Sequence, residues 1–218
     1  TMLQKKSMTF GGLQAHMLNN EVAKLLDSET MRASKYLAIL KGEPKLMKGT
    51  GQRFMHRMTI APNTSSAIIA GSVSAGIAPI YANAFIQSIS GGEVSRVNPE
   101  LITVMKQAGV YNEETVKDIL KNDGSVQHVE WLTDHQKDVF KTAFELNQAD
   151  LVRLASQRQR YLDQGQSLDL YFPAGTSEEY ISKIHKMAFT DKYLLALYYI
   201  RSSKSNKASS GECTACAS

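Results

Sequence analysis

Apolar side chains recur at helical spacing through residues 13–41, where Leu18, Val22 and Leu25 fall on one face. This pattern predicts a single long helix with an apolar face. Gly42-Glu43-Pro44 interrupts the pattern, because glycine and proline both disfavour a continuing helix.

The rest of the chain alternates shorter helical patterns with short apolar stretches. Helical spacing and capping signals, including a capping box of Thr176 and Glu179, predict further helices at residues 62–71, 101–108, 113–121, 133–164 and 176–193. Apolar or alternating runs predict strand-like pieces within residues 80–97, 167–172 and 194–200. The first of these regions contains a Gly91-Gly92 turn, and the last is expected to be a buried strand. Long helices alternating with short apolar strands indicate an α/β architecture.

Composition narrows the class of protein only a little. The 218 residues are 43% hydrophobic, which allows one large domain or two small ones. Lys and Arg exceed Asp and Glu by 25 to 21, and this mild, well-mixed charge gives little support for nucleic-acid or membrane binding. No apolar run is long enough to span a bilayer, and no apolar segment follows Lys5 and Lys6 as in a secretory leader. We therefore expect a cytoplasmic protein without nucleic-acid or membrane partners.

Asn63, Thr64, Ser65 and Ser66 form a hydroxyl-rich turn between Pro62 and the predicted small-residue helix. The free N–H groups of a first helical turn, hydroxyl donors and the helix dipole together favour an anion. An ordinary Ser/Thr helix cap is the default explanation of the same residues. No lysine of the P-loop type accompanies them, so ATP hydrolysis is not indicated.

Tyr198 and Tyr199 lie side by side in the last apolar run. Neighbouring side chains on a strand point to opposite faces, so two core aromatics are the default interpretation. The alternative is a redox relay, since adjacent phenols can pass an electron and a proton.

Cys213 and Cys216 are the only cysteines, and they lie in a tail of Ser, Lys, Asn, Ala and Gly that begins at residue 202 and is expected to be flexible. Zinc binding is not indicated, because the five histidines show no ligand spacing. A thioredoxin-type site needs a strand and helix around the pair, and none is predicted here. A mobile dithiol and incidental surface thiols remain, and the absence of other thiols slightly favours the dithiol.

Several segments add a more specific signal when their order and spacing are considered together. They are residues 61–71 (APNTSSAIIAG), 76–79 (GIAP), 90–93 (SGGE), 97–101 (VNPEL), 122–127 (NDGSVQ), 157–168 (QRQRYLDQGQSL) and 197–199 (LYY). With the paired tail cysteines, this ordered set resembles the carboxy-terminal part of the large, catalytic subunit of class I ribonucleotide reductase. The resemblance covers nearly the whole chain from about Leu13.

The resemblance implies a fold and a set of roles. Residues 1–201 would form the carboxy-terminal half of a ten-stranded α/β barrel, and residues 202–218 a flexible, redox-active tail. The site residues would be the phosphate-binding Asn63, Thr64, Ser65 and Ser66, the radical-relay tyrosines Tyr198 and Tyr199, and the disulfide-reducing Cys213 and Cys216. The activity implied is the reduction of ribonucleoside diphosphates to deoxyribonucleotides for DNA synthesis.

One departure from the family bears on the partners. The family's reaction uses a thiyl-radical cysteine and a reducing cysteine pair, whereas no cysteine precedes Cys213 in this chain. We therefore expect an amino-terminal half of the large subunit as a separate partner. The resemblance also implies a small subunit with a metal–tyrosyl radical, and thioredoxin or glutaredoxin as reductant, with no cofactor or metal bound by this chain. The alternative is a non-catalytic nucleotide- or phosphate-binding module.

Overall fold

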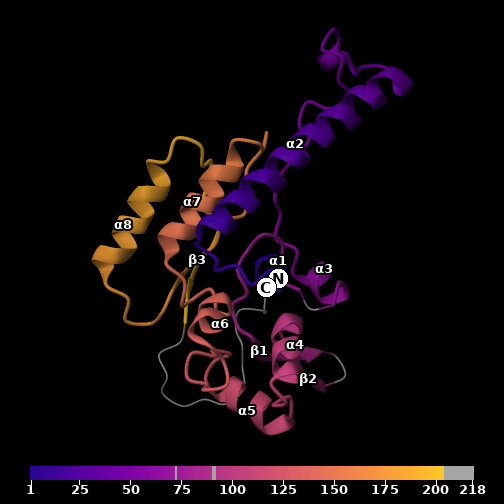
Figure 1. The fold of residues 1–218 in the computed structure, drawn as a ribbon. Helices are drawn as coiled ribbons and strands as arrows, with labels where there is room; N and C mark the ends of the chain where they lie inside the picture. Colours follow the sequence, from indigo (N-terminus) through magenta and orange to yellow (C-terminus); the bar gives the residue numbers. More distant parts are fainter. Residues whose placement is uncertain (72, 90–91, 204–218) are drawn as a thin grey trace.

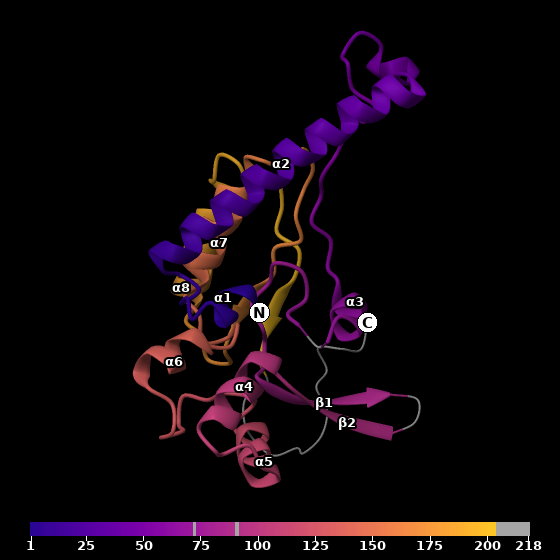
Figure 2. The same ribbon diagram turned by 45° about the vertical axis from the view of Figure 1, so that its right-hand side comes forward.

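A long helix projects from a body of shorter helices and strands (Figures 1 and 2). The structure is a computed structural model that describes residues 1–71, 73–89 and 92–203. Helix α2 (Leu13–Lys41) begins in the body and ends in a loop that contains the short 3₁₀-helix η1 (Lys45–Met47). The long helix predicted from the apolar spacing is confirmed at both of its ends.

The near end of α2 lies against α7 (Gln148–Gln159) in both views (Figures 1 and 2). Small side chains allow this contact, since Ala15 and Ala23 are buried. The side-chain amide of Asn19 fixes the crossing by donating to the Leu154 carbonyl at 3.0 Å. The first half of α2 is thereby anchored to the body, whereas its far end carries exposed apolar side chains.

Parallel strands lie next to α7 and α8 (Glu178–Phe189). Strand β3 (Leu170–Phe172) pairs in parallel with β4 (Ile200–Ser202), and α8 forms the crossover between them. Shortly before β3 in the chain, Gln166 forms a parallel bridge with Ile60. This strand–helix–strand order is that of an α/β barrel wall, because parallel neighbours need a crossover connection. The described residues form no closed sheet.

A second region packs a hairpin against short helices. Strands β1 (Ala84–Ile89) and β2 (Gly92–Val97) pair antiparallel, which confirms the strand-like pieces expected within residues 80–97. Helices α4 (Pro99–Gln107), α5 (Glu113–Lys121) and α6 (Asp134–Val139) complete this region. Their shared core contains Leu101, Met105, Ile119, Val126 and Phe140.

Helix starts in this region follow from their capping residues. The Asn98 side chain accepts from the Glu100 N–H ahead of α4, and Asn112 accepts from the Thr115 N–H ahead of α5. The predicted helices at 101–108 and 113–121 are confirmed, the second at both ends. Short helix α1 (Met2–Lys5) precedes α2.

The single helix predicted over residues 133–164 is wrong. The chain forms α6 and α7 instead, with an irregular segment at residues 140–147 between them. Val139 and Phe140 pack into the core of the hairpin region, whereas Leu151 and Ala155 pack beside the parallel strands. The apolar positions thus belong to two cores, and Asn147 starts a new helix by capping the Ala149 N–H.

The helix predicted at residues 176–193 is α8, but its capping residue is Ser177 rather than Thr176. The Ser177 hydroxyl accepts from the Tyr180 N–H at 3.3 Å, while the Thr176 hydroxyl donates to the Pro173 carbonyl at 2.6 Å. Thr176 therefore closes the preceding turn, and the helix starts one residue later than its capping-box pattern indicates.

The prediction of a buried strand over residues 194–200 is also wrong. Regular strand structure begins at Ile200, and Tyr198 and Tyr199 are 49% and 43% exposed. The backbone still joins the ladder, because the Tyr198 N–H donates to the Leu168 carbonyl and the Tyr199 carbonyl accepts from the Leu170 N–H. Both rings are thus partly exposed, and the apolar composition of the run did not predict burial correctly.

Two further expectations concern the carboxy-terminal tail and membrane-spanning helices. The expected tail begins at residue 202, but β4 extends through Ser202, and the Ser203 N–H still bonds to the Phe172 carbonyl. The rest of the tail, residues 204–218, lies outside the described residues and includes Cys213 and Cys216. Within the described part, every helix is too short or too polar to cross a membrane.

Candidate functional site

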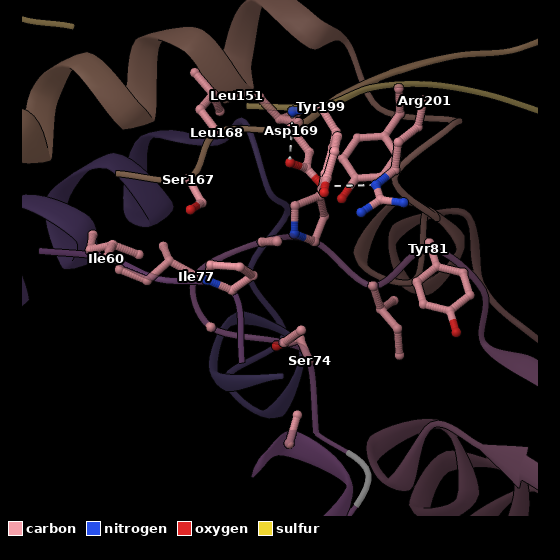
Figure 3. Close-up of a pocket in the computed structure, with 18 of the residues that line it drawn as sticks. Ile60, Ser74, Ile77, Tyr81, Leu151, Ser167, Leu168, Asp169, Tyr199 and Arg201 are labelled. Carbon is pink, nitrogen blue, oxygen red and sulfur yellow. Dashed lines mark hydrogen bonds and ion pairs between the residues drawn. The ribbon is translucent and has the colours of Figure 1, made fainter. Parts of the chain in front are cut away.

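A cavity of about 510 Å³ lies between the hydroxyl-rich loop and the parallel strands (Figure 3). Ile60 and Ser167 mark one side of it, and Tyr81 and Arg201 the other. Most of its lining comes from stretches far apart in sequence, namely residues 60–67, 73–81, 167–171 and 199–202. The cavity therefore lies beside the segment that leads into β3 and along β4 itself.

The predicted phosphate-binding residues surround the start of α3 (Thr64–Ile69). Ser65 lines the cavity, and Asn63 and Ser66 are exposed beside it. The backbone of Thr64 begins the helix, while its side chain is outside the described atoms. The helix predicted within residues 62–71 is confirmed, and one of its hydroxyl-bearing residues lines the cavity.

Gly76 also lines the cavity and lies close to the chain that enters this loop. Its φ is +59°, in the left-handed region that side chains other than glycine adopt only at a cost. A Cβ at this position would lie 3.5 Å from the Ala61 carbonyl oxygen and 3.9 Å from the Asn63 amide nitrogen. The turn at Gly76 thus passes close to the chain that leads into the hydroxyl-rich loop.

The rings of Tyr198 and Tyr199 are in contact, tilted by 49°, rather than pointing to opposite faces. Their ring centroids are 4.0 Å apart, and the Tyr198 hydroxyl donates to the Tyr199 hydroxyl oxygen at 3.2 Å. This hydrogen bond, with the Tyr199 charge, raises the pKa of Tyr198 above its usual value. The interpretation as two core aromatics is therefore wrong, whereas the contact between the two phenols is the geometry that a relay requires.

Sequence reasoning missed an ion pair beside these rings. The Arg201 Nε donates to an Asp169 carboxylate oxygen at 2.8 Å, and the Arg201 guanidinium carbon lies 4.9 Å from the centre of the Tyr199 ring (Figure 3). Burial opposes the charge of Arg201, but the hydrogen bond and the charge of Asp169 raise its pKa. The parallel register, with Leu170 opposite Ile200, brings these residues together, and no sequence signal gives that register.

Tyr171 is a further phenol in the cavity wall that the sequence did not single out. It is buried, and its ring meets Phe144 edge to face. Burial raises the pKa of Tyr171 to about 12, and the negative charge of Asp169 adds to the effect. At neutral pH this side chain is a neutral hydrogen-bonding group.

A buried cation lines the same cavity. Arg158 is 7% exposed, and its Nε donates to the Gln166 side chain at 2.7 Å. Burial lowers the pKa of Arg158 to about 10, so the guanidinium remains charged at neutral pH. Arg158 donates hydrogen bonds to the side-chain amides of Gln166 and Asn19, which link α7 to the strand region and to α2.

Known proteins share this architecture. Residues 44–200 match the family described as "Ribonucleotide reductase, barrel domain". The chain is 38% identical over 205 residues to the ribonucleoside-diphosphate reductase large subunit of Invertebrate iridescent virus 3, covering 93% of this chain and 32% of that protein. It is 36% identical over 158 residues to the ribonucleoside-diphosphate reductase subunit alpha of Chlamydia trachomatis, covering 72% of this chain and 15% of that protein.

A solved structure agrees with the sequence relatives. The class Id ribonucleotide reductase alpha subunit of Actinobacillus ureae superposes with a TM-score of 0.84 at 38% identity, covering 94% of this chain and 37% of that chain. The fold is thus that of an α/β barrel protein, and the chain belongs to the ribonucleotide reductase barrel-domain family. It spans less than two fifths of the length of each of these relatives.

Proposed function

We propose that this chain is the carboxy-terminal part of a ribonucleoside-diphosphate reductase large subunit. The observation that carries the proposal is that Ser65 and Tyr199 line one cavity, although they are far apart in sequence. A hydroxyl donor suited to phosphate and a phenol in contact with a second phenol thus meet at one site. A reductase of this family needs both functions at the same substrate.

The phosphate-binding part of the proposal assigns Asn63, Thr64, Ser65 and Ser66 to the substrate diphosphate. Backbone N–H groups and hydroxyl donors can bind phosphate oxygens without a lysine. Ser65 supports the assignment through its position in the cavity wall, and the turn at Gly76 holds the adjacent chain. The occupant that we propose is a ribonucleoside diphosphate.

The radical part assigns Tyr198 and Tyr199 to electron and proton transfer. In each exchange, a phenoxyl radical on one tyrosine takes an electron from the other ring and a proton from its hydroxyl, so that a phenol and a new phenoxyl radical result. The 3.2 Å contact between the hydroxyl groups supports this exchange, because the proton has only a hydrogen-bond length to cross. The initial oxidant is a radical-bearing small subunit.

The tail part assigns Cys213 and Cys216 to reduction of a disulfide that forms during turnover. Thiol–disulfide exchange transfers two electrons from the dithiol and leaves the tail as a disulfide. Thioredoxin or glutaredoxin then reduces the tail again. This assignment is supported by the sequence resemblance, since both cysteines lie outside the described residues.

The remaining part of the barrel must reach this site for catalysis. The resemblance implies that the thiyl-radical cysteine and its reducing pair belong to the amino-terminal half of the large subunit, on the same polypeptide or another. Exposed apolar side chains support such a partner surface. These side chains lie along α2 and in the loop after it, and they include Leu25, Tyr36, Ile39, Leu40, Leu46, Phe54 and Met55.

Calorimetric titration with a ribonucleoside diphosphate tests the substrate assignment. We expect tight binding only when the chain is combined with the amino-terminal half of a large subunit from a relative such as that of Invertebrate iridescent virus 3. Strong binding by the isolated chain, unaffected by that half, would instead support the non-catalytic nucleotide-binding module.

A further inference from the structure

The ion pair between Asp169 and Arg201 contacts one of the two tyrosine rings. The Arg201 guanidinium lies over the face of the Tyr199 ring, at 4.9 Å from its centre, and no such contact with Tyr198 occurs among the described residues. Tyr198 and Tyr199 nevertheless share a hydrogen bond and are in ring contact. The pair of phenols is therefore electrostatically asymmetric.

Asp169 fixes this arrangement with both of its carboxylate oxygens. One oxygen accepts from the Arg201 Nε at 2.8 Å, and the other accepts from the Tyr199 backbone N–H at 3.3 Å. The Asp169 carboxylate thus connects the Arg201 guanidinium to the backbone of Tyr199, and the guanidinium lies over the ring of that same tyrosine. Both side chains are partly buried, with exposed fractions of 15% for Asp169 and 32% for Arg201, so water screens the pair only in part.

We propose that Asp169 and Arg201 are positioning residues that set where the unpaired electron resides in the tyrosine pair. This inference rests on the proposed radical relay and adds a preference for Tyr198 over Tyr199. A cation over an aromatic face stabilises the electron-rich reduced ring. Oxidation removes an electron from that ring and weakens the attraction, so oxidation of Tyr199 becomes less favourable.

The electron and the proton whose transfer the Asp169–Arg201 pair biases pass only between the two phenols. When Tyr198 is the phenol and Tyr199 the radical, one electron and one proton pass from Tyr198 to Tyr199, which restores the Tyr199 hydroxyl and leaves the radical on Tyr198. Arg201 gains and loses no proton in this step. Tyr171 lines the same cavity, and burial raises its pKa to about 12, which keeps this phenol neutral at neutral pH.

The test replaces Tyr199 with 3-aminotyrosine, a residue that is more easily oxidised than an ordinary tyrosine. Square-wave voltammetry on the full chain alone measures its midpoint potential. We expect Arg201→Gln to lower that midpoint potential, and Asp169→Asn to lower it by a smaller amount. The potential of the Arg201→Lys chain should stay closer to that of the chain with Arg201. Arg153→Gln is the matched control, since it breaks another arginine–aspartate pair, on exposed α7 surface.

A second measurement uses the assembled reductase. Electron paramagnetic resonance reports the radical trapped at position 199, and Arg201→Gln should raise its yield about two- to fivefold, as expected for a cation–π contact. Equal potentials in the Arg201→Gln and Arg153→Gln chains would overturn the inference. A failure to trap radical in any assembled variant would overturn the proposed relay instead, and the potentials would still decide the role of Arg201.

Discussion

The hydroxyl of Tyr198 donates to the hydroxyl of Tyr199 at 3.2 Å, although the two residues are adjacent in the chain. Side chains of adjacent residues on a regular strand point to opposite faces, so this contact needs the irregular backbone that precedes β4. The two rings are in contact, and Tyr199 lines the cavity. This geometry places the phenol pair next to the cavity where we propose that phosphate binds.

Ser65→Ala should raise the KM for the ribonucleoside diphosphate about tenfold or more in the assembled reductase, since a hydrogen bond to a charged group contributes about 1.5–3 kcal/mol. The change in kcat should be smaller, because the proposal places the Ser65 hydroxyl at the phosphate and not at the reacting sugar. Steady-state kinetics measure both. Ser28→Ala, on exposed α2, is the control and should leave KM unchanged. An unaltered KM in Ser65→Ala would remove Ser65 from the phosphate site.

Cys213→Ser and Cys216→Ser should each abolish turnover driven by thioredoxin. A single thiol cannot complete the exchange that releases a reduced target and an oxidised tail. Turnover driven by a small dithiol should survive, because that reagent can reduce the active-site disulfide directly. Parallel assays with the two reductants measure the difference. Full thioredoxin-driven activity in both variants would show that the tail carries no reducing equivalents.

Gly124→Ala should destabilise the hairpin region far more than Gly109→Ala. Both glycines have positive φ, but a Cβ at Gly124 would lie 2.5 Å from the Ala82 Cβ and 2.7 Å from the Ala84 carbonyl oxygen, whereas nothing lies within 4 Å at Gly109. Backbone strain alone costs about 1 kcal/mol, and strain plus overpacking about 3 kcal/mol. Urea unfolding of the two variants measures these free energies. Equal losses would mean that the close approach at Gly124 is absent.

Asp163 should make the stability of the chain depend on acid pH. Burial opposes its charge, but hydrogen bonds from the Met58 and Arg57 N–H groups, with the charge of Arg57, lower its pKa below 3.8. Because the folded-state pKa is the lower one, the stabilisation is present above pH 3.8 and is lost as the pH falls through the folded-state value. Asp163→Asn should reduce stability at neutral pH and flatten this dependence.

Thermal unfolding from neutral pH down to about pH 3 measures the effect of Asp163. Asp138→Asn is the control, since Asp138 forms an exposed pair with Lys141 three residues away. A steep acid dependence that persisted unchanged in Asp163→Asn would assign the effect to other carboxylates.

The sequence predicted those elements whose signals are local. The spacing of α2, the asparagine caps of α4 and α5, and the strands of the hairpin all depend on residues close together in the chain. The break between α6 and α7 was missed because Val139 and Leu151 belong to different cores, which only the tertiary structure separates.

The roles of the predicted site residues stay predictions, whereas their arrangement in space is a result of the structure alone. The resemblance named the hydroxyl-rich loop and both tyrosines, but the contact between the Tyr198 and Tyr199 rings contradicts a regular strand. Asp169 and Arg201 meet only through the parallel register of β3 and β4. That register depends on how α8 returns the chain, and residue pattern alone does not determine it.

Deoxyribonucleotide formation in a reconstituted mixture tests the central claim most directly. The mixture contains this chain, the amino-terminal half of a large subunit and the radical-bearing small subunit, with a small dithiol as reductant. We predict turnover in the complete mixture, none with this chain alone, and a loss of at least about 100-fold in Tyr198→Phe and Tyr199→Phe, since each removes a proton-transfer group. Tyr111→Phe, at an exposed tyrosine outside the site, should retain full activity. Full activity in both relay variants, or none in the complete unsubstituted mixture, would contradict the account.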